Sequence, residues 1–254
     1  MKDTKSEHRD QNQNIIFGRN PVIEALKSGR AVEKVLVSSS DGSARQIIAM
    51  AKEKGIPVVK TERQVLDRIG GGASHQGVAA YVSAYAYAQM DDILAKAQSA
   101  GEEPFVIILD GLEDPHNLGA IMRTAECAGA HGIIIPKRNS CGLTETVAKT
   151  SAGAIEYMPC VKVSNIVRTI DELKTMGFWI AACDMGGQEY YRTDLRGKLA
   201  VVIGGEGNGI SRLVKEACDF TVSMPMKGKI TSLNASNAAA VLMYEVRRQR
   251  DGER

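Results

Sequence analysis

The sequence predicts an α/β protein made of a small N-terminal unit and a larger C-terminal unit. Segments of strand character alternate with segments of helical periodicity along the chain. Several strands in the second half are continuous apolar runs, the pattern of parallel strands buried on both faces. A domain boundary is expected at 85–91, and the alternation restarts at Pro104, so two cores are expected. The expected organisation is a disordered tail at 1–13, an N-terminal domain at 14–84, a linker at 85–91 and a C-terminal domain at 92–250.

The N-terminal unit opens with a short apolar run and continues into a helix. This helix carries Val22, Ile23 and Leu26 on one face, and Gly29 is expected to end it. Strand and helix patterns then follow each other closely, as in a small α/β unit with its own core. The expected strands are 32–40, 56–61 and 77–88, and the expected helices are 43–55 and 62–71.

The C-terminal unit begins with FVIILDGL at 105–112, a run typical of a buried parallel strand. A helix is expected at 116–132 and a second buried strand at 132–136. Six strands are expected in all, and an alanine-rich helix at 234–250 closes the unit. The other expected elements are a helix and strand within 145–163, a helix at 164–178, and strands at 179–184, 198–207 and 220–226.

The composition excludes several classes of protein. An apolar content of 44% and a mean hydropathy of −0.16 are typical of a globular chain with a sizeable core. The chain opens with no apolar leader and holds no stretch near the roughly 18 apolar residues of a membrane span, so a cytoplasmic protein without a membrane partner is expected. Five cysteines without a CxxC pair and four scattered histidines indicate neither a disulfide framework nor a metal site.

The charge is unevenly distributed between the two units. The net charge is +2, but residues 1–89 hold 13 Lys and Arg against 9 Asp and Glu. A basic N-terminal unit is compatible with contact to phosphate backbones, although a solvated surface explains this excess almost as well. Charge alone therefore gives only slight support to nucleic-acid binding.

A glycine-rich turn, IGGEGNGI at 203–210, follows a strand and precedes a helix. Its glycines would let backbone groups approach a ligand with no Cβ in the way. The spacing of Gly205, Gly207 and Gly209 is not that of a dinucleotide-binding loop, and Asp219 precedes a strand instead of ending one. A nicotinamide-dependent oxidoreductase is therefore disfavoured, while a glycine-rich connection with no ligand stays open.

A second polar segment is DGLEDPHNLGAIMRT at 110–124. Pro115 favours an extended approach, and Asn117 stands where an N-cap would begin the next helix. Asn117 could therefore serve as a cap alone. Arg123, six residues later, could be a solvated arginine.

A third polar segment is MPMKGKITSLNASNAAAVLMYE at 224–245. Ser232, Asn234 and Ser236 crowd the start of a helix, and any of them could cap it. Hydroxyl and amide groups beside Leu233 are also what a pocket for adenine and ribose needs, because such a pocket satisfies ring nitrogens while burying a flat ring. This loop by itself does not distinguish the two possibilities.

Together these segments resemble the three motifs of the SpoU/TrmH family, a branch of the SPOUT RNA methyltransferases. DPHNLGAIMRTAE, GGEGNGISR and MPMKGKITSLNASNAAA occur in the family's order, and AKTSAGAIEYMP resembles the segment between the first two. This resemblance covers residues 104–250. The FGRNPVIEAL opening and the unit behind it resemble the ribosomal-protein-like RNA-binding domain of the RlmB-type group, which methylates a guanosine of large-subunit (23S) ribosomal RNA.

The resemblance implies a fold that the residue pattern alone would not suggest. It implies a C-terminal knotted α/β methyltransferase domain with a trefoil knot, beside a small N-terminal α/β RNA-binding domain. Knots are so rare that periodicity alone suggests an ordinary doubly wound sheet. The resemblance also implies a homodimer in which residues of both subunits complete each site.

The resemblance further implies an RNA 2'-O-methyltransferase that uses S-adenosylmethionine. The ribose 2'-oxygen would displace the sulfonium in line, so the enzyme must align the reactants, exclude water and remove one proton. The implied cofactor-binding residues are Gly204, Gly205, Met224 and Leu233. The implied catalytic and RNA-facing residues are Asn117, Arg123, Glu206, Ser232 and Asn234.

The family proposal makes Arg123 the proton acceptor. A guanidinium group is a very weak base, so we favour a clamp for phosphate and oxyanion. Glu206 and Asn117 are then expected to orient Arg123 and the ribose. Ser232 and Asn234 are expected to hold the target nucleotide.

Two alternatives remain from the sequence. The first is a 2'-O-methyltransferase of tRNA or of another ribosomal RNA site. The second is a non-catalytic RNA-binding assembly factor on the same fold, which would be expected to lack Arg123, Glu206 or Asn234, and all three are present. A reaction at the 2'-hydroxyl selects RNA, so no DNA partner is expected. Lys227 and Lys229 could add phosphate contacts beside the site.

Overall fold

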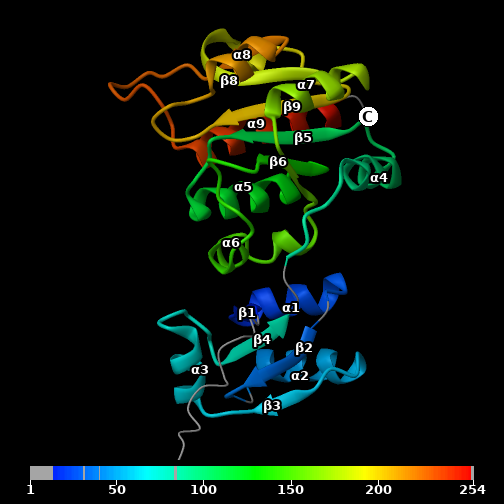
Figure 1. Cartoon of the computed structure of the whole chain (residues 1–254), viewed down its shortest axis with the longest axis vertical. Coiled ribbons are helices and arrows are strands. Elements are labelled where there is room, and N and C mark those ends of the chain that lie inside the picture. The colour runs from blue at the N-terminus through cyan, green and yellow to red at the C-terminus, as the bar shows by residue number, and fades with distance from the viewer. Residues whose placement is uncertain (1–13, 31, 40, 83–84, 253–254) are drawn as a thin grey trace, which may run out of the picture. The chain divides into compact units, whose positions relative to one another are not determined.

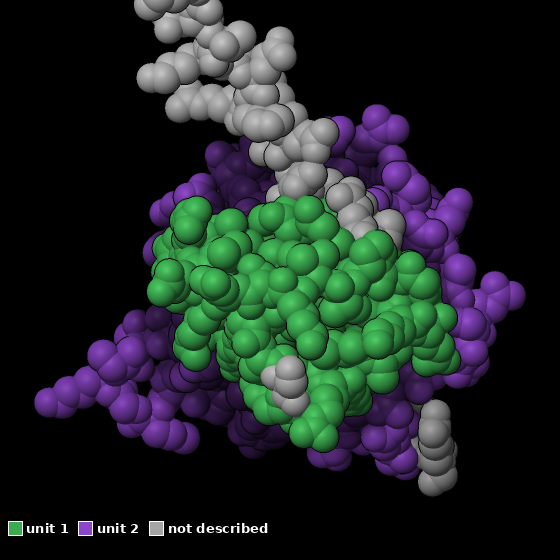
Figure 2. Space-filling model, turned by 90° about the horizontal axis from the view of Figure 1, so that it is seen from below, with its two compact units in different colours: residues 1–84 green, residues 85–254 purple. Residues whose placement is uncertain are grey.

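The structure, a computed structural model, describes residues 14–30, 32–39, 41–82 and 85–252. The tail expected to be disordered, residues 1–13, lies outside the described residues. The chain divides into two compact units, residues 1–84 and 85–254. Figure 1 shows both units as ribbons, and Figure 2 colours them green and purple.

In its described residues the first unit forms a four-stranded sheet of order β1-β4-β2-β3. Strand β4 is antiparallel to β1 and β2, and β2 is parallel to β3. The strands are β1 (Asn14–Phe17), β2 (Val32–Val37), β3 (Val58–Lys60) and β4 (Val78–Val82). The helices are α1 (Arg19–Ser28), α2 (Gly42–Glu53) and α3 (Arg63–Gly70).

Both faces of this sheet carry buried side chains, since successive residues of a strand point to opposite faces. Leu36 packs with Leu66 of α3 on one face, while its neighbour Val35 is buried on the other. Helix α1 buries Val22 and Leu26 as expected, although Ile23 is only half-buried. The helix ends at Gly29 with a left-handed φ of 78°, so this predicted helix end is confirmed.

The second unit is built on a six-stranded sheet of order β10-β8-β9-β5-β6-β7. Every strand pairing in this sheet is parallel, so all carboxyl ends lie along one edge. The prediction of six strands and a buried parallel sheet is confirmed. The strands are β5 (Phe105–Asp110), β6 (Gly132–Pro136), β7 (Cys160–Val163), β8 (Trp179–Glu189), β9 (Leu199–Gly204) and β10 (Phe220–Ser223).

Helices cover both faces of this sheet (Figure 1). Ile107 and Leu109 face α5 (Pro115–Cys127), α6 (Glu145–Thr150) and α9 (Ala235–Asp251). Val106 and Ile108 face α4 (Met90–Ala100), α7 (Ile166–Thr175) and α8 (Arg212–Ala217). Two short 3-10 turns complete the unit, η1 (Ala154–Glu156) and η2 (Tyr190–Arg192). The predicted α/β class is confirmed, and the threading of a knot stays a prediction.

The junction between the units differs from the expectation. Strand β4 ends at Val82, so the strand expected at 77–88 is too long. Ala88 instead forms a parallel bridge to Val161 in the second unit. Helix α4, which the sequence analysis did not identify, begins at Met90, and it presents only Ile93 and Ala97 as fully buried residues. This short apolar stripe explains why the helix was missed.

None of the helices in the described ranges combines the length and the apolar character needed to cross a membrane.

Candidate active site

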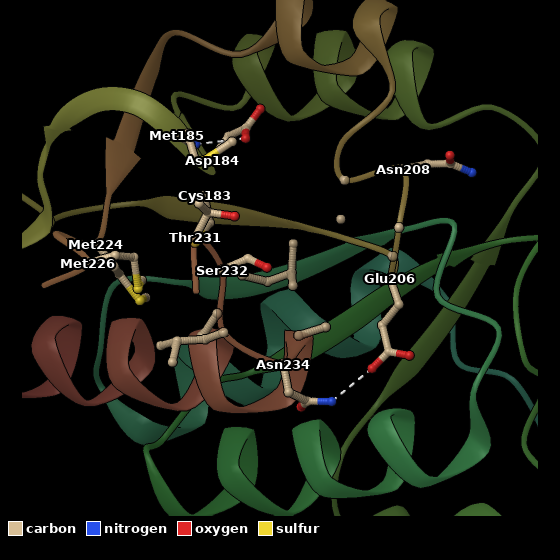
Figure 3. Close-up of a pocket in the computed structure, with 18 residues that line it drawn as sticks. Cys183, Asp184, Met185, Glu206, Asn208, Met224, Met226, Thr231, Ser232 and Asn234 are labelled. Carbon is tan, nitrogen blue, oxygen red and sulfur yellow. Dashed lines mark hydrogen bonds between the residues drawn. The ribbon is translucent and has the colours of Figure 1, made fainter. Parts of the chain in front are cut away.

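A cavity of about 630 Å³ opens at the carboxyl edge of the second sheet (Figure 3). Its walls come from the middle of β8, from the end of β9 and the turn after it, from the segment that follows β10 and from the first turn of α9. This volume lies within the range of small-molecule sites, which are about 300–1,000 Å³. The edge where parallel strands end is also where α/β sheets bind their ligands.

The turn after β9 is fixed by close backbone packing. The N–H of Gly205 donates to the carbonyl oxygen of Asp110 at 2.8 Å, which ties the turn to the end of β5. A Cβ on Gly205 would lie 2.0 Å from the carbonyl oxygen of Gly111, and one on Gly204 would lie 2.2 Å from the carbonyl carbon of Gly209. Glycine at 204 and 205 is therefore required by the protein's own backbone. The turn can thus hold Glu206 in one place.

Glu206 joins the three polar segments identified in the sequence. Its Oε1 atom accepts hydrogen bonds from the side-chain amides of Asn117 and Asn234, both at 2.8 Å. Figure 3 shows Asn234 and Glu206 directed toward each other at the cavity. One carboxylate oxygen therefore binds two amides, one in the first turn of α5 and one at the N-cap of α9.

Asn117 does not cap α5. The cap is Asp114, whose Oδ1 accepts from the N–H of His116 at 2.9 Å, and the helix begins at Pro115. Asn117 lies inside the first turn and is buried. The hypothesis that Asn117 serves only as a cap is therefore wrong, and its amide is free to bind Glu206.

Asn234 is both a cap and a site residue. Its Oδ1 accepts from the N–H of Ser236 at 2.9 Å at the start of α9. Its Nδ2 donates to Glu206, so the two ends of one amide perform two tasks. The capping interpretation is confirmed for Asn234, and it does not compete with the functional one.

The structure brings most of the candidate residues to the cavity. All four residues expected to bind the cofactor line it: Gly204, Gly205, Met224 and Leu233. Three of the candidate catalytic residues also line it: Glu206, Ser232 and Asn234. Asn117 adjoins the cavity through Glu206.

Arg123 is the exception among the candidates. It is exposed on α5, it does not line the cavity, and it has no hydrogen bond or ion pair with the described residues. The expected contact of Arg123 with Glu206 and Asn117 is absent within the part of the chain that the structure describes. Its six-residue separation from Asn117 corresponds to about 9 Å along a helix.

The sequence analysis missed the cavity residues of β8. Cys183, Asp184 and Met185 line the cavity because β8 is the neighbour of β9. Asp184 forms an ion pair with Lys215 of α8 at 2.6 Å. Burial, with Asp184 nearby, raises the pKa of the Cys183 thiol to about 11, so this thiol stays protonated at neutral pH. The sequence predicts a strand that ends at Asp184, whereas β8 continues to Glu189, and only the strand order shows that this part of β8 lies beside the end of β9.

The cavity can hold a ligand that is partly apolar and partly polar. Ile203, Leu233 and Met224 supply apolar surface, while the turn after β9 supplies backbone groups and a carboxylate. Among the described residues, no group of three or more His, Cys, Asp or Glu is placed to hold a metal ion.

Both units match families of known proteins. A profile described as the SpoU rRNA Methylase family matches residues 104–244. A profile described as RNA 2'-O ribose methyltransferase substrate binding matches residues 15–88. The boundary between these matches lies close to the division of the chain into two compact units.

Individual proteins are similar over nearly the whole chain. YacO of Bacillus subtilis (strain 168), whose name assigns it to the TrmH family of tRNA/rRNA methyltransferases, is 51% identical over 244 residues, covering 95% of this chain and 98% of its own. A TrmH-family-named protein of Staphylococcus epidermidis is 48% identical over 242 residues, covering 93% and 96%. The crystal structure of the SpoU methyltransferase AviRb from Streptomyces viridochromogenes, in complex with the cofactor AdoMet, has a TM-score of 0.80 at 25% identity, covering 94% and 91%.

Proposed function

Because the chain belongs to the SpoU/TrmH family of RNA methyltransferases, we propose that it transfers a methyl group from S-adenosylmethionine to the ribose 2'-hydroxyl of a guanosine in large-subunit (23S) ribosomal RNA. The observation that carries the proposal is the junction at Glu206. Glu206 belongs to the second sequence motif, and it accepts hydrogen bonds from Asn117 of the first motif and Asn234 of the third. The three residues meet beside a cavity large enough for the cofactor.

The cavity fits the cofactor by size and by donor set. The apolar side chains of Ile203, Met224 and Leu233 suit a flat adenine, and the backbone of the turn after β9 offers hydrogen bonds to its nitrogens. The carboxylate of Glu206, which has no ion pair with a described residue, favours a ligand that carries positive charge. When bound, S-adenosylmethionine supplies an electrophilic methyl group on a cationic sulfur.

Glu206 is placed to position the attacking hydroxyl. Its Oε1 is occupied by Asn117 and Asn234, while its Oε2 has no hydrogen bond with a described residue. The second oxygen can therefore accept a hydrogen bond from the ribose 2'-hydroxyl and draw its proton away as the oxygen attacks. Ser232, which is exposed and also lines the cavity, can hold the nucleotide by its hydroxyl.

Arg123 cannot serve this cavity from its observed position, so we assign it to the second site of a homodimer. A guanidinium group on the exposed face of α5 is available to a neighbouring copy. There it would clamp a phosphate of the RNA and stabilise the developing oxyanion. This role requires two copies of the chain for each complete site.

The match of residues 15–88 to a substrate-binding profile supports RNA as the substrate. The N-terminal unit favours ribosomal RNA over transfer RNA through its resemblance to the RlmB-type domain. The test is transfer of labelled methyl from S-adenosylmethionine to unmodified ribosomal RNA and, separately, to unmodified tRNA, with nuclease mapping of the product.

We expect label in one large-subunit guanosine, with resistance to alkaline cleavage on its 3' side. Label found only in tRNA would support the proposed 2'-O-methylation reaction but contradict ribosomal RNA as the substrate. No label in either RNA despite cofactor binding would favour a non-catalytic RNA-binding factor.

A further inference from the structure

The loop after β6 presents two adjacent basic side chains at its tip. Lys137 and Arg138 are both exposed, and neither side chain has a hydrogen bond or ion pair within the described part of the chain. This differs from other exposed arginines of the second unit, such as Arg168 and Arg212, which form ion pairs with glutamates one helical turn away. The two charges are therefore available to an external anion.

This loop is held in place at both ends. The N–H of Lys137 donates to the carbonyl oxygen of Val163 at 2.8 Å, and the N–H of Cys141 donates to the carbonyl oxygen of Leu112 at 2.9 Å. Between them, Asn139 adopts a left-handed φ of 54°, a turn conformation that asparagine tolerates better than most residues other than glycine. The basic pair thus projects from a shaped turn that is fixed to the sheet.

The loop lies on the same edge of the sheet as the cavity. Strand β6 pairs with β5, and β5 pairs with β9, whose end carries Glu206. Two strand spacings separate β6 from β9, which is about 10 Å. The bond of Cys141 to Leu112 also links the loop to the segment whose Gly111 contacts Gly205. This separation is within the reach of one or two nucleotides from a ribose placed at Glu206.

We propose that Lys137 and Arg138 bind backbone phosphates of the RNA next to the target nucleotide, so that the strand runs along the carboxyl edge of the sheet. The inference rests on the proposed function, because it requires the target ribose to enter the cavity at this edge. Arginine binds phosphate through its planar fork and lysine binds it as a point charge. Such contacts position the strand and contribute little to base selection.

The test is the salt dependence of RNA binding by the full-length chain without cofactor. The probe is a short, labelled, single-stranded RNA of mixed sequence, and the double variant is Lys137→Ala with Arg138→Ala. Loss of two phosphate contacts should lower the slope of log Kd against log salt by about 1.4 and weaken binding about tenfold or more at low salt. Cofactor binding should not change.

The control replaces Arg196 and Lys198 with alanine. These two basic residues are also exposed, but they lie at the amino end of β9, about 20 Å along the strand from Glu206. They differ from Lys137 and Arg138 in having partners, since Arg196 pairs with Asp194 and Lys198 donates to the carbonyl oxygen of Met176. The control should keep the wild-type slope. The charge-conserving double variant, Lys137→Arg with Arg138→Lys, should also keep the wild-type slope. This comparison separates an effect of lost charge from an effect of misfolding.

An unchanged slope in the alanine double variant would overturn the inference, as would an equal fall in the control. This outcome is distinct from failure of the proposed function. A wild-type chain that transfers no methyl group would refute the proposed function while the binding slopes still test the phosphate contacts.

Discussion

The Oε1 atom of Glu206 accepts a hydrogen bond of 2.8 Å from the side-chain amide of Asn117, which lies 89 positions earlier in the chain. Strands β5 and β9, which precede these residues, are neighbours in the sheet. The strand pairing therefore places the first motif beside the second. A buried amide then fixes a carboxylate at the mouth of the cavity.

Replacing Asn117 with aspartate should destabilise the protein, because a buried carboxylate would face Glu206. We expect the free energy of unfolding to fall by about 2 kcal/mol at neutral pH, measured by urea denaturation. Adding Glu206→Gln in the same chain restores a donor–acceptor pair and should recover part of the loss. Equal stability of the single and double variants would show that the two side chains are not coupled.

Gly205→Ala should disrupt the turn after β9. Its Cβ would lie 2.0 Å from the carbonyl oxygen of Gly111, so the backbone must move. We expect a loss of about 1–3 kcal/mol in unfolding free energy and weaker cofactor binding, measured by urea denaturation and calorimetry. Gly228→Ala is the control, since its Cβ would meet nothing within 4 Å. Similar losses in both variants would contradict the close packing.

Arg123 should act across a dimer interface. Arg123→Ala and Glu206→Ala should each be inactive as homodimers. Mixing and reassembling the two should restore activity, because one site in each heterodimer would combine an intact Glu206 with an intact Arg123. About one quarter of wild-type activity is expected, since half of the dimers would be mixed and each would have one working site. A mixture without activity would place Arg123 and Glu206 in the same chain's site.

His131 should make the protein sensitive to acid. It is buried, and its Nδ1 accepts from the N–H of Phe105 at 3.0 Å. Burial, and secondarily the positive charge of Arg250, lowers the pKa of His131 from 6.5 to about 4. The unfolded chain thus binds a proton that the folded chain does not, so stability present above pH 6.5 is lost as the pH falls toward 4.

This loss should amount to roughly 2–3 kcal/mol, measured by urea denaturation across this pH range. The variant His131→Asn keeps an acceptor for Phe105 and has no titrating group, so its stability should depend less on pH. An identical pH dependence in both proteins would assign the acid sensitivity to other groups.

The pattern of apolar residues along the sequence predicted many of the strands and helices. It could not predict which strands lie next to each other in the sheet. The apolar runs of β5, β6 and β9 identify buried parallel strands because these strands contact helices on both faces. Helix α4 escaped notice because it buries only Ile93 and Ala97 fully. Sequence spacing also could not show that β8 adjoins β9, so Asp184 was missed as a cavity residue.

The candidate site shows the same limit of local reasoning. Asn117 resembles an N-cap when its segment is considered alone. In the structure Asp114 caps α5, and Asn117 instead binds Glu206 in the turn after β9. The resemblance to a family supplied what local pattern could not, namely that Asn117, Glu206 and Asn234 belong together. Their meeting at one oxygen gives that grouping a physical basis.

The most direct test of the central claim is the single-turnover rate of methyl transfer in Glu206→Gln. Glutamine can keep an oxygen for Asn117 and Asn234 while removing the charge. The account predicts a rate lowered by about 100-fold or more, with the Kd for S-adenosylmethionine changed by less than about threefold. The control Glu216→Gln, at an exposed residue of α8, should keep the wild-type rate. A near-wild-type rate in Glu206→Gln would contradict a catalytic role for the carboxylate.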